Sequence, residues 1–259
     1  MTINKQTQIS IQTITDYHLE SFIRCPYRFY YQHVLSVKTS KIKWRQAVQF
    51  IINQVVHKFY QLPFEEQHKL SALKLIESLW SIISSSIFDT KYHYYQVLAK
   101  TTDHLLQFLS ARVSQTPPIF LYKKLSTYIE ELETQLSLTF DVSEWSEKSF
   151  TIKKFLLEAD EEMIHLYNHL LVVFSYKAFG KLPEKIEVVT LLKGETFTYS
   201  PSVDDLVKGI TYLKYMKNVL LEPTDYERKY ANNDDCISCP FTQQCEKSMG
   251  DNSEIDLLH

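Results

Sequence analysis

The sequence predicts a mixed α/β fold with a helical insertion, and three observations predict it. Apolar residues recur at helical spacing through roughly the first 110 residues. After Pro117 and Pro118 the pattern changes to short runs rich in β-branched and aromatic residues. A helical segment, a strand pair and a last long helix then follow. The expected order is therefore helices, a strand meander, a helix, a strand pair and a helix.

The first helical region begins where Thr15 or Asp16 can cap a helix that runs to about Val34. A basic connection over 37–45 leads to a second helix over 46–62. Apolar residues at helical spacing predict two further helical segments, over 70–83 and 95–109. The two prolines after them end this helical region.

The strand region begins with three runs, over 119–126, 134–145 and 149–157, and residues 143–149 form the expected hairpin turn. A helix over 160–179 follows, and Gly180 ends it as a C-cap. We then expect a buried strand over 185–192, a turn over 193–195, a partner strand over 196–200 and a last helix over 204–221.

Length and composition indicate an ordinary globular protein. The 259 residues are 44% hydrophobic and 23% charged. No stretch is apolar enough to predict a membrane span, and the first ten residues lack the apolar core of a signal peptide, so we expect a cytoplasmic protein. Only four glycines occur, which excludes a Walker loop and a dinucleotide fingerprint. We expect one domain made of N-terminal helices (1–62), a helical insertion (63–118), an α/β core (119–222) and a tail (223–259).

The charge is distributed unevenly. The net charge is −3, but residues 1–60 carry eight basic and two acidic residues, a net +6, which leaves −9 for the remainder. A basic segment on an acidic body can attract a polyanion to one face, although a solvated surface would have the same composition.

Four cysteines form the most specific pattern in the chain. Cys236, Cys239 and Cys245 have C-x2-C-x5-C spacing, and Cys25 lies 211 residues before the first of them. Four thiolates in a reducing compartment suit zinc or an iron–sulfur cluster. If Cys25 joins the other three, the centre staples the two ends of the chain together. Closing so long a loop corresponds to about 4–5 kcal/mol of chain entropy.

These cysteines and the segment CPYRFYY that begins at Cys25 resemble the iron–sulfur-stapled branch of the PD-(D/E)XK nucleases. That branch includes RecB-like nuclease domains, the AddB subunit of bacterial helicase–nucleases and CRISPR-associated spacer-processing exonucleases. The resemblance covers residues 13–245. It implies a nuclease-like mixed sheet flanked by helices, and a 4Fe–4S cluster on the four cysteines, with zinc as the alternative.

The resemblance also implies a catalytic set that holds Mg²⁺ or Mn²⁺ for phosphodiester hydrolysis. His57 fits the histidine of the first helix motif, and Asp141 fits the strand aspartate. These two residues are the expected metal ligands. In the hairpin that follows, Lys154 stands where the family has a carboxylate, and Leu156 where it has a lysine.

The next helix supplies Tyr167 of the family's glutamine–tyrosine motif, but Met163 replaces the glutamine. The candidate catalytic set is therefore His57, Asp141, Lys154 and Tyr167, in a degenerate form. After a shift of register, four nearby acids could replace the missing ligands: Glu144, Glu158, Asp160 and Glu161.

Three hypotheses follow. The first is a degenerate nuclease that binds DNA, single-stranded or end-bearing, or organises a complex with a helicase or another nuclease subunit. The second is an active Mg²⁺- or Mn²⁺-dependent DNA exonuclease with relocated ligands. The third is a protein-binding subunit without DNA contact. The candidate phosphate-binding residues are Arg24, Arg28, Lys41, Lys43 and Arg45, and the candidate stacking residues are Tyr27, Phe29, Tyr30 and Tyr31, unless these pack in the core.

Overall fold

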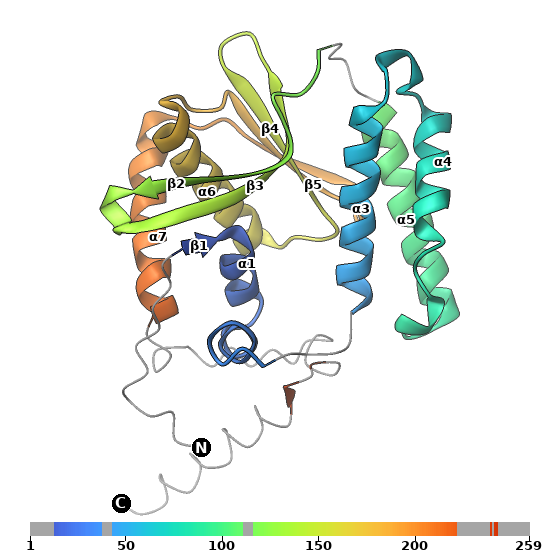
Figure 1. The fold of residues 1–259 in the computed structure, drawn as a ribbon, viewed down its shortest axis with the longest axis horizontal. Coiled ribbons are helices and arrows are strands. Elements are labelled where there is room, and N and C mark those ends of the chain that lie inside the picture. Colours follow the sequence, from blue (N-terminus) through green and yellow to red (C-terminus); the bar gives the residue numbers. More distant parts are fainter. Residues whose placement is uncertain (1–12, 38–42, 111–115, 222–238, 240, 243–259) are drawn as a thin grey trace, which may run out of the picture.

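The structure is a computed structural model that describes residues 13–37, 43–110, 116–221, 239 and 241–242. A six-stranded mixed sheet lies at its centre, and helices cover both faces (Figure 1). The predicted order of helices and strands is confirmed, except that a short strand that the sequence analysis does not predict precedes the first helix. None of the helices in these ranges combines the length and the apolar character that crossing a bilayer requires.

The N-terminal helical region is built from three pieces. Strand β1 (Thr13–Thr15) leads into α1 (Asp16–Arg24), and Thr15 is the N-cap, as predicted. A single helix to Val34 is wrong, because Cys25 is extended, with φ −167° and ψ 108°. It precedes a proline, and the residue before a proline avoids the helical region. Cys25 then caps α2 (Pro26–Phe29), which continues into a π-helix, η1 (Tyr30–Val34).

The next three helices form one side of the molecule. They are α3 (Trp44–Gln61), α4 (Lys69–Trp80) and α5 (Lys91–Ser110), with short 3₁₀ helices η2 (Phe64–Glu66) and η3 (Ser85–Ile87) between them. Figure 1 shows α4 and α5 as a hairpin beside α3. α3 packs on β2 and β4, and α5 reaches the turn after β5, where His104 Nδ1 lies 2.8 Å from the carbonyl oxygen of Leu191. The apolar faces of these helices form a core that includes Val142 and Phe155 of the sheet.

The sheet begins with the expected meander, β2 (Phe120–Ile129), β3 (Thr134–Trp145) and β4 (Phe150–Leu156), with a 3₁₀ helix, η4 (Glu130–Leu132), between the first two. β5 (Lys185–Thr190) lies parallel to β4, and β6 (Glu195–Tyr199) pairs with β5. The strand order is β1-β3-β4-β5-β6, and β2 pairs with the other edge of β3.

The long strand β3 changes partner along one edge. It pairs with β1 over Gln135–Ser137 and with β4 over Val142–Trp145. Residues 138–141 have no ladder partner on that edge among the strands described here. The strands therefore separate next to Asp141, and the candidate site lies at this gap.

Two helices complete the layer on the face opposite α3. Asp160 caps the start of α6 (Glu161–Phe179), and Gly180 ends it in the left-handed region at φ +67°, as predicted. The last described helix is α7 (Val203–Leu221), which packs on α6. The second core lies between the sheet and α1, α6 and α7, and it includes Phe29 and Tyr30. Because these two side chains are buried, the hypothesis that they stack on bases is wrong.

Candidate functional site

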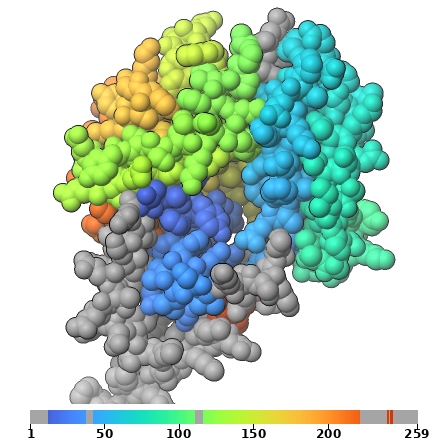
Figure 2. Space-filling view, in the orientation of Figure 1, coloured from blue at the N-terminus to red at the C-terminus, as the bar shows by residue number. Residues whose placement is uncertain are grey.

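A cavity of about 480 Å³ opens where β3 and β4 separate. The helices α1 and α3 form two of its walls, and Figure 2 shows their surfaces on either side of a hollow. Residues 139 and 141 in the middle of β3, the end of β4 with the two residues after it (154–158), and Tyr167 of α6 line the cavity as well. The sequence-predicted residues Asp141, Lys154 and Tyr167 all line this cavity.

The deepest part of the cavity is an ion pair. Lys154 Nζ lies 2.8 Å from Asp141 Oδ1, and both side chains are almost fully buried. The N–H of Phe155 donates to Asp141 Oδ2 over 2.9 Å. Burial disfavours the ammonium, but the carboxylates of Asp141 and Asp16 outweigh it and raise the pKa of Lys154. Lys154 is therefore a fixed positive charge.

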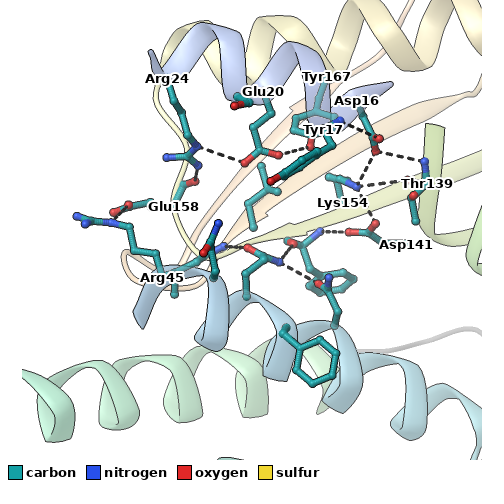
Figure 3. A pocket seen from close by; sticks show the side chains of 18 of the residues that line it. Asp16, Tyr17, Glu20, Arg24, Arg45, Thr139, Asp141, Lys154, Glu158 and Tyr167 are labelled. Carbon is teal, nitrogen blue, oxygen red and sulfur yellow. Dashed lines mark hydrogen bonds and ion pairs between the residues drawn. The ribbon is translucent and has the colours of Figure 1, made fainter. Parts of the chain in front are cut away.

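The first helix contributes two more carboxylates. Asp16 Oδ2 accepts from the N–H of Thr139 and lies 3.8 Å from Lys154 Nζ. Glu20, one turn later, accepts from the hydroxyl of Tyr167 over 3.0 Å. Burial, together with the charge of Glu20, raises the pKa of Tyr167 well above its usual value, so this hydroxyl stays protonated. The Lys154 ammonium lies 4.9 Å from the centre of the Tyr167 ring, a cation–π contact. We call Asp16, Asp141, Lys154 and Tyr167 the floor (Figure 3).

The other end of the cavity carries the basic residues. We define its mouth as Arg24, Arg28, Lys43, Arg45 and Glu158, all of which line the cavity. Arg45 forms an ion pair with Glu158, and Arg24 Nε lies 3.3 Å from Glu20 Oε1. In Figure 3, Arg24, Arg45 and Glu158 lie at the end away from the Lys154–Asp141 pair. Four of the five predicted phosphate-binding residues are thus brought together, whereas Lys41 lies outside the described residues.

Helix α3 presents amides to the cavity instead of a histidine. Gln49 Oε1 accepts from the N–H of Leu157 over 2.7 Å, and its Nε2 donates to the carbonyl of Phe155 over 2.9 Å. Asn53 lines the cavity one turn later. His57 is one further turn along, where its ring contacts Tyr122 edge-on at 5.7 Å between centroids.

His57 is therefore not among the residues that line the cavity, and its predicted pairing with Asp141 as a metal ligand is not found. The reason is the direction of α3. The helix passes the gap between β3 and β4 at Gln49 and Asn53, and its next turn faces the core that contains Tyr122. The histidine consequently lies beyond the site.

The sequence leaves the register of the β3–β4 hairpin open, and the structure has the unshifted one. The pair Val142–Lys153 places Lys154 beside Asp141, and Leu156 lines the cavity at the expected lysine position. Of the four acids considered as replacements, only Glu158 lines the cavity, and it lies at the mouth. Glu144 binds Lys153 over 2.7 Å, Asp160 caps α6, and Glu161 is exposed on that helix.

These residues do not fit a divalent metal ion. Within the ranges that the structure describes, no three His, Cys, Asp or Glu side chains form a metal-binding group. At the floor, an ammonium already occupies the position next to Asp141 that an Mg²⁺ or Mn²⁺ ion would need.

Two of the four cysteines of the predicted metal centre, Cys25 and Cys239, lie in the described part of the chain. The sulfur of Cys25 accepts from the N–H of Arg28 over 3.5 Å, and the carbonyl of Cys239 accepts from the N–H and the hydroxyl of Thr242. Phe241, two residues after Cys239, is buried and stacks on Tyr31 of η1 at 5.2 Å between centroids. The C-terminal segment thus contacts the helical piece that follows Cys25. Cys236 and Cys245 lie outside the described residues, so the ligand set stays a prediction.

Of the comparisons with known proteins, only the one with solved structures found a match. No family model and no curated protein matches the chain. Among solved structures, a protein from Eubacterium rectale described as a "Putative exonuclease" aligns with a TM-score of 0.47 and 8% identity, covering 91% of each chain. We interpret the site from its own geometry.

Sequence reasoning missed the contribution of α1. Asp16 was considered only as a cap, and Glu20 was not considered. The signal was present, because Asp16, Glu20 and Arg24 recur every four residues and therefore share one face of the helix. Nothing in the spacing, however, shows that this face closes over Asp141, 121 residues or more along the chain.

Proposed function

We propose that this chain is a nuclease-like protein of DNA processing, in recombination, repair or defence, that binds DNA or organises a complex without cutting it. The observation that carries this proposal is the 2.8 Å ion pair between Lys154 and Asp141. Metal-assisted phosphodiester hydrolysis needs carboxylates that hold a divalent cation next to the phosphate. Here the ammonium of Lys154 lies next to Asp141, where a divalent ion would have to bind.

The mouth supports DNA as the ligand. Three of its cations, Arg24, Arg28 and Arg45, come from α1, α2 and α3 and line the same cavity, whereas the ammonium of Lys43 is buried. Phosphate contacts of this kind dominate nucleic-acid affinity and make it depend on salt. We propose single-stranded or end-bearing DNA, and a helicase or another nuclease subunit as the protein partner.

The absence of cutting is tested with labelled single- and double-stranded DNA and Mg²⁺ or Mn²⁺. We expect no cleavage by folded protein. Metal-dependent cleavage that disappears in Asp141→Asn would overturn the proposal. It would favour an active exonuclease whose metal is held by acids of α1, since Asp16 and Glu20 bring two further carboxylates to this end of the cavity.

The replacement of the metal by Lys154 has its own test. In Lys154→Glu, the floor gains a carboxylate and loses the ammonium, so we expect Mn²⁺ to raise the melting temperature of this variant. The parent protein should show no such rise. An equal Mn²⁺ effect on both proteins would show that the ion binds elsewhere or that Lys154 does not exclude it.

DNA binding is tested by fluorescence anisotropy across a salt series. In Arg28→Gln/Arg45→Gln we expect affinity to fall about tenfold or more, and the salt slope to decrease by about 1–2. The matched control is Lys74→Gln/Lys100→Gln, which removes two exposed cations from α4 and α5. If the parent protein binds no DNA at low salt, the protein-binding subunit becomes the better hypothesis.

We also propose that Cys25, Cys236, Cys239 and Cys245 hold a 4Fe–4S cluster. The contact between Phe241 and Tyr31 supports this, because it brings the C-terminal segment to the helices that follow Cys25. Anaerobically purified protein should contain about four iron and four sulfide per chain, and Cys25→Ser should lose both. About one zinc per chain without sulfide would identify the alternative.

A further inference from the structure

Two exposed aromatic rings line the cavity, one from each of its helical walls. Tyr17 of α1 is 50% exposed and Phe50 of α3 is 57% exposed. No ring in the described part of the chain stacks on Phe50. A single exposed aromatic residue is ordinary on a protein surface. Two of them in one cation-lined cavity indicate a surface for a planar ligand.

Tyr17 is held in place for such a role. Gln32 Nε2 donates to its hydroxyl over 3.1 Å, and the ring of His33 packs edge-on against it at 5.2 Å. Both contacts come from η1, which follows α1 and α2 in the chain. The ring is therefore oriented before any ligand arrives, and less side-chain entropy is lost on binding.

The charges of the cavity determine which way a nucleotide enters. Asp16, Glu20 and Asp141 lie toward the floor and repel a phosphate, even though Lys154 compensates part of their charge. The cations of the mouth attract one. A nucleotide therefore lies with its phosphate at the mouth and its base further in, where Tyr17 lies between the two ends (Figure 3).

The shape of the cavity restricts the ligand to a strand end. A volume of about 480 Å³ is in the range of small-molecule sites and leaves room for about one nucleotide. At the floor the cavity ends against Asp141, Lys154 and Tyr167, whose side chains are almost fully buried. A continuous strand would have to pass through a closed end, and a duplex would not enter.

We infer that this cavity receives the unpaired terminal nucleotide of a single DNA strand. The base stacks against Tyr17 and Phe50, and its phosphate is bound by Arg28 and Arg45. This inference rests on the proposed function and names the part of the DNA that the site takes. Base–aromatic stacking is independent of sequence, so the site accepts any of the four bases.

The test uses full-length protein and three DNA probes of one sequence: a linear single strand, the same strand circularised, and a blunt duplex. We expect the linear strand to bind about tenfold or more tightly than the other two. Phe50→Ala should weaken linear binding by about tenfold or more. Tyr92→Ala is the matched control, because Tyr92 of α5 is 76% exposed and does not line the cavity.

A second readout reports on the base itself. A 2-aminopurine placed at the terminus should lose fluorescence on binding, and the loss should be smaller in Phe50→Ala and in Tyr17→Leu. Binding that depends on Arg28 and Arg45 but is equal for linear and circular strands would overturn the inference and leave the proposed function standing. No DNA binding by the parent protein would overturn both.

Discussion

The floor and the mouth of the cavity are built from the same kinds of charged side chain but in opposite ways. At the floor, Lys154 and Asp141 are almost fully buried and contact each other over 2.8 Å. At the mouth, Arg45 and Glu158 are each 31% exposed in their side chains, and Arg24 is 30% exposed. Water screens the second group of charges and not the first.

This difference separates two roles within one cavity. A buried charge that loses its partner is strongly destabilising, so the floor is fixed by the stability of the fold. An exposed ion pair contributes little to stability, so the mouth can exchange its internal partners for a ligand. The charges of the mouth can therefore change at little cost to the fold, whereas those of the floor cannot.

The largest expected effect comes from breaking the floor. Lys154→Met leaves the carboxylates of Asp141 and Asp16 buried beside an apolar side chain, and we expect a loss of about 3–5 kcal/mol of unfolding free energy. Urea unfolding followed by circular dichroism measures it. Lys154→Met/Asp141→Leu should recover most of the loss. A single variant that loses less than about 1 kcal/mol would show that the pair is not the buried unit described here.

The second-largest loss of stability is expected at Gln49, whose side chain lies between the floor and the mouth. The Gln49 amide bonds the carbonyl of Phe155 and the N–H of Leu157, between the floor and the mouth. Gln49→Leu keeps the bulk but leaves both backbone groups without this partner, so we expect a loss of about 2–3 kcal/mol by urea unfolding. Gln46→Leu, one turn earlier and exposed, is the control and should lose less than about 1 kcal/mol. Equal losses would contradict the role of Gln49.

The fold was more predictable from the sequence than the site. The strands of the meander, the α6 helix with its Gly180 cap and the final hairpin follow from local patterns, so the sequence predicts them. The register of the β3–β4 hairpin is different, because the sequence leaves it open although one residue of slip would reverse every side chain. The site depends on contacts between distant segments. No local sequence pattern shows that Asp16 lies close to Asp141 and Lys154. None shows that α3 borders the cavity with Asn53 and not with His57.

A smaller effect on stability is expected from the pH, through the half-buried ring of His33. Burial lowers the pKa of His33 to about 4, and the neighbouring His18 adds to this. Because the folded pKa of this base is depressed, its contribution to stability is complete above about pH 6.5 and is lost as the pH falls toward 4. The loss is about 1–2 kcal/mol after screening, since the ring is only half-buried.

The pH dependence of urea unfolding between pH 7 and pH 4 measures this loss. His33→Phe keeps a ring next to Tyr17 and Phe29 and should reduce the slope, while the matched change His165→Phe, at a side chain that is 60% exposed, should leave it unchanged. Lys154 should not contribute to the change in unfolding free energy between pH 7 and pH 4. Its pKa is raised, so its contribution is complete below about pH 10.4 and is lost only as the pH rises through the folded value. A slope unaffected by His33→Phe would assign the pH dependence to other groups.

The smallest effect on stability is expected at the mouth, where the effect on binding is largest. Arg45→Gln removes one partly exposed ion pair with Glu158 and should change the unfolding free energy by less than about 1 kcal/mol. The same substitution should weaken DNA binding severalfold and lower its salt dependence, because one phosphate contact is lost. Glu158→Gln provides the opposite control. It removes the negative charge of Glu158 from the mouth, so DNA binding should strengthen while stability changes equally little. If Arg45→Gln and Glu158→Gln shift binding in the same direction, the mouth acts through its structure, and its charge is not what attracts the ligand.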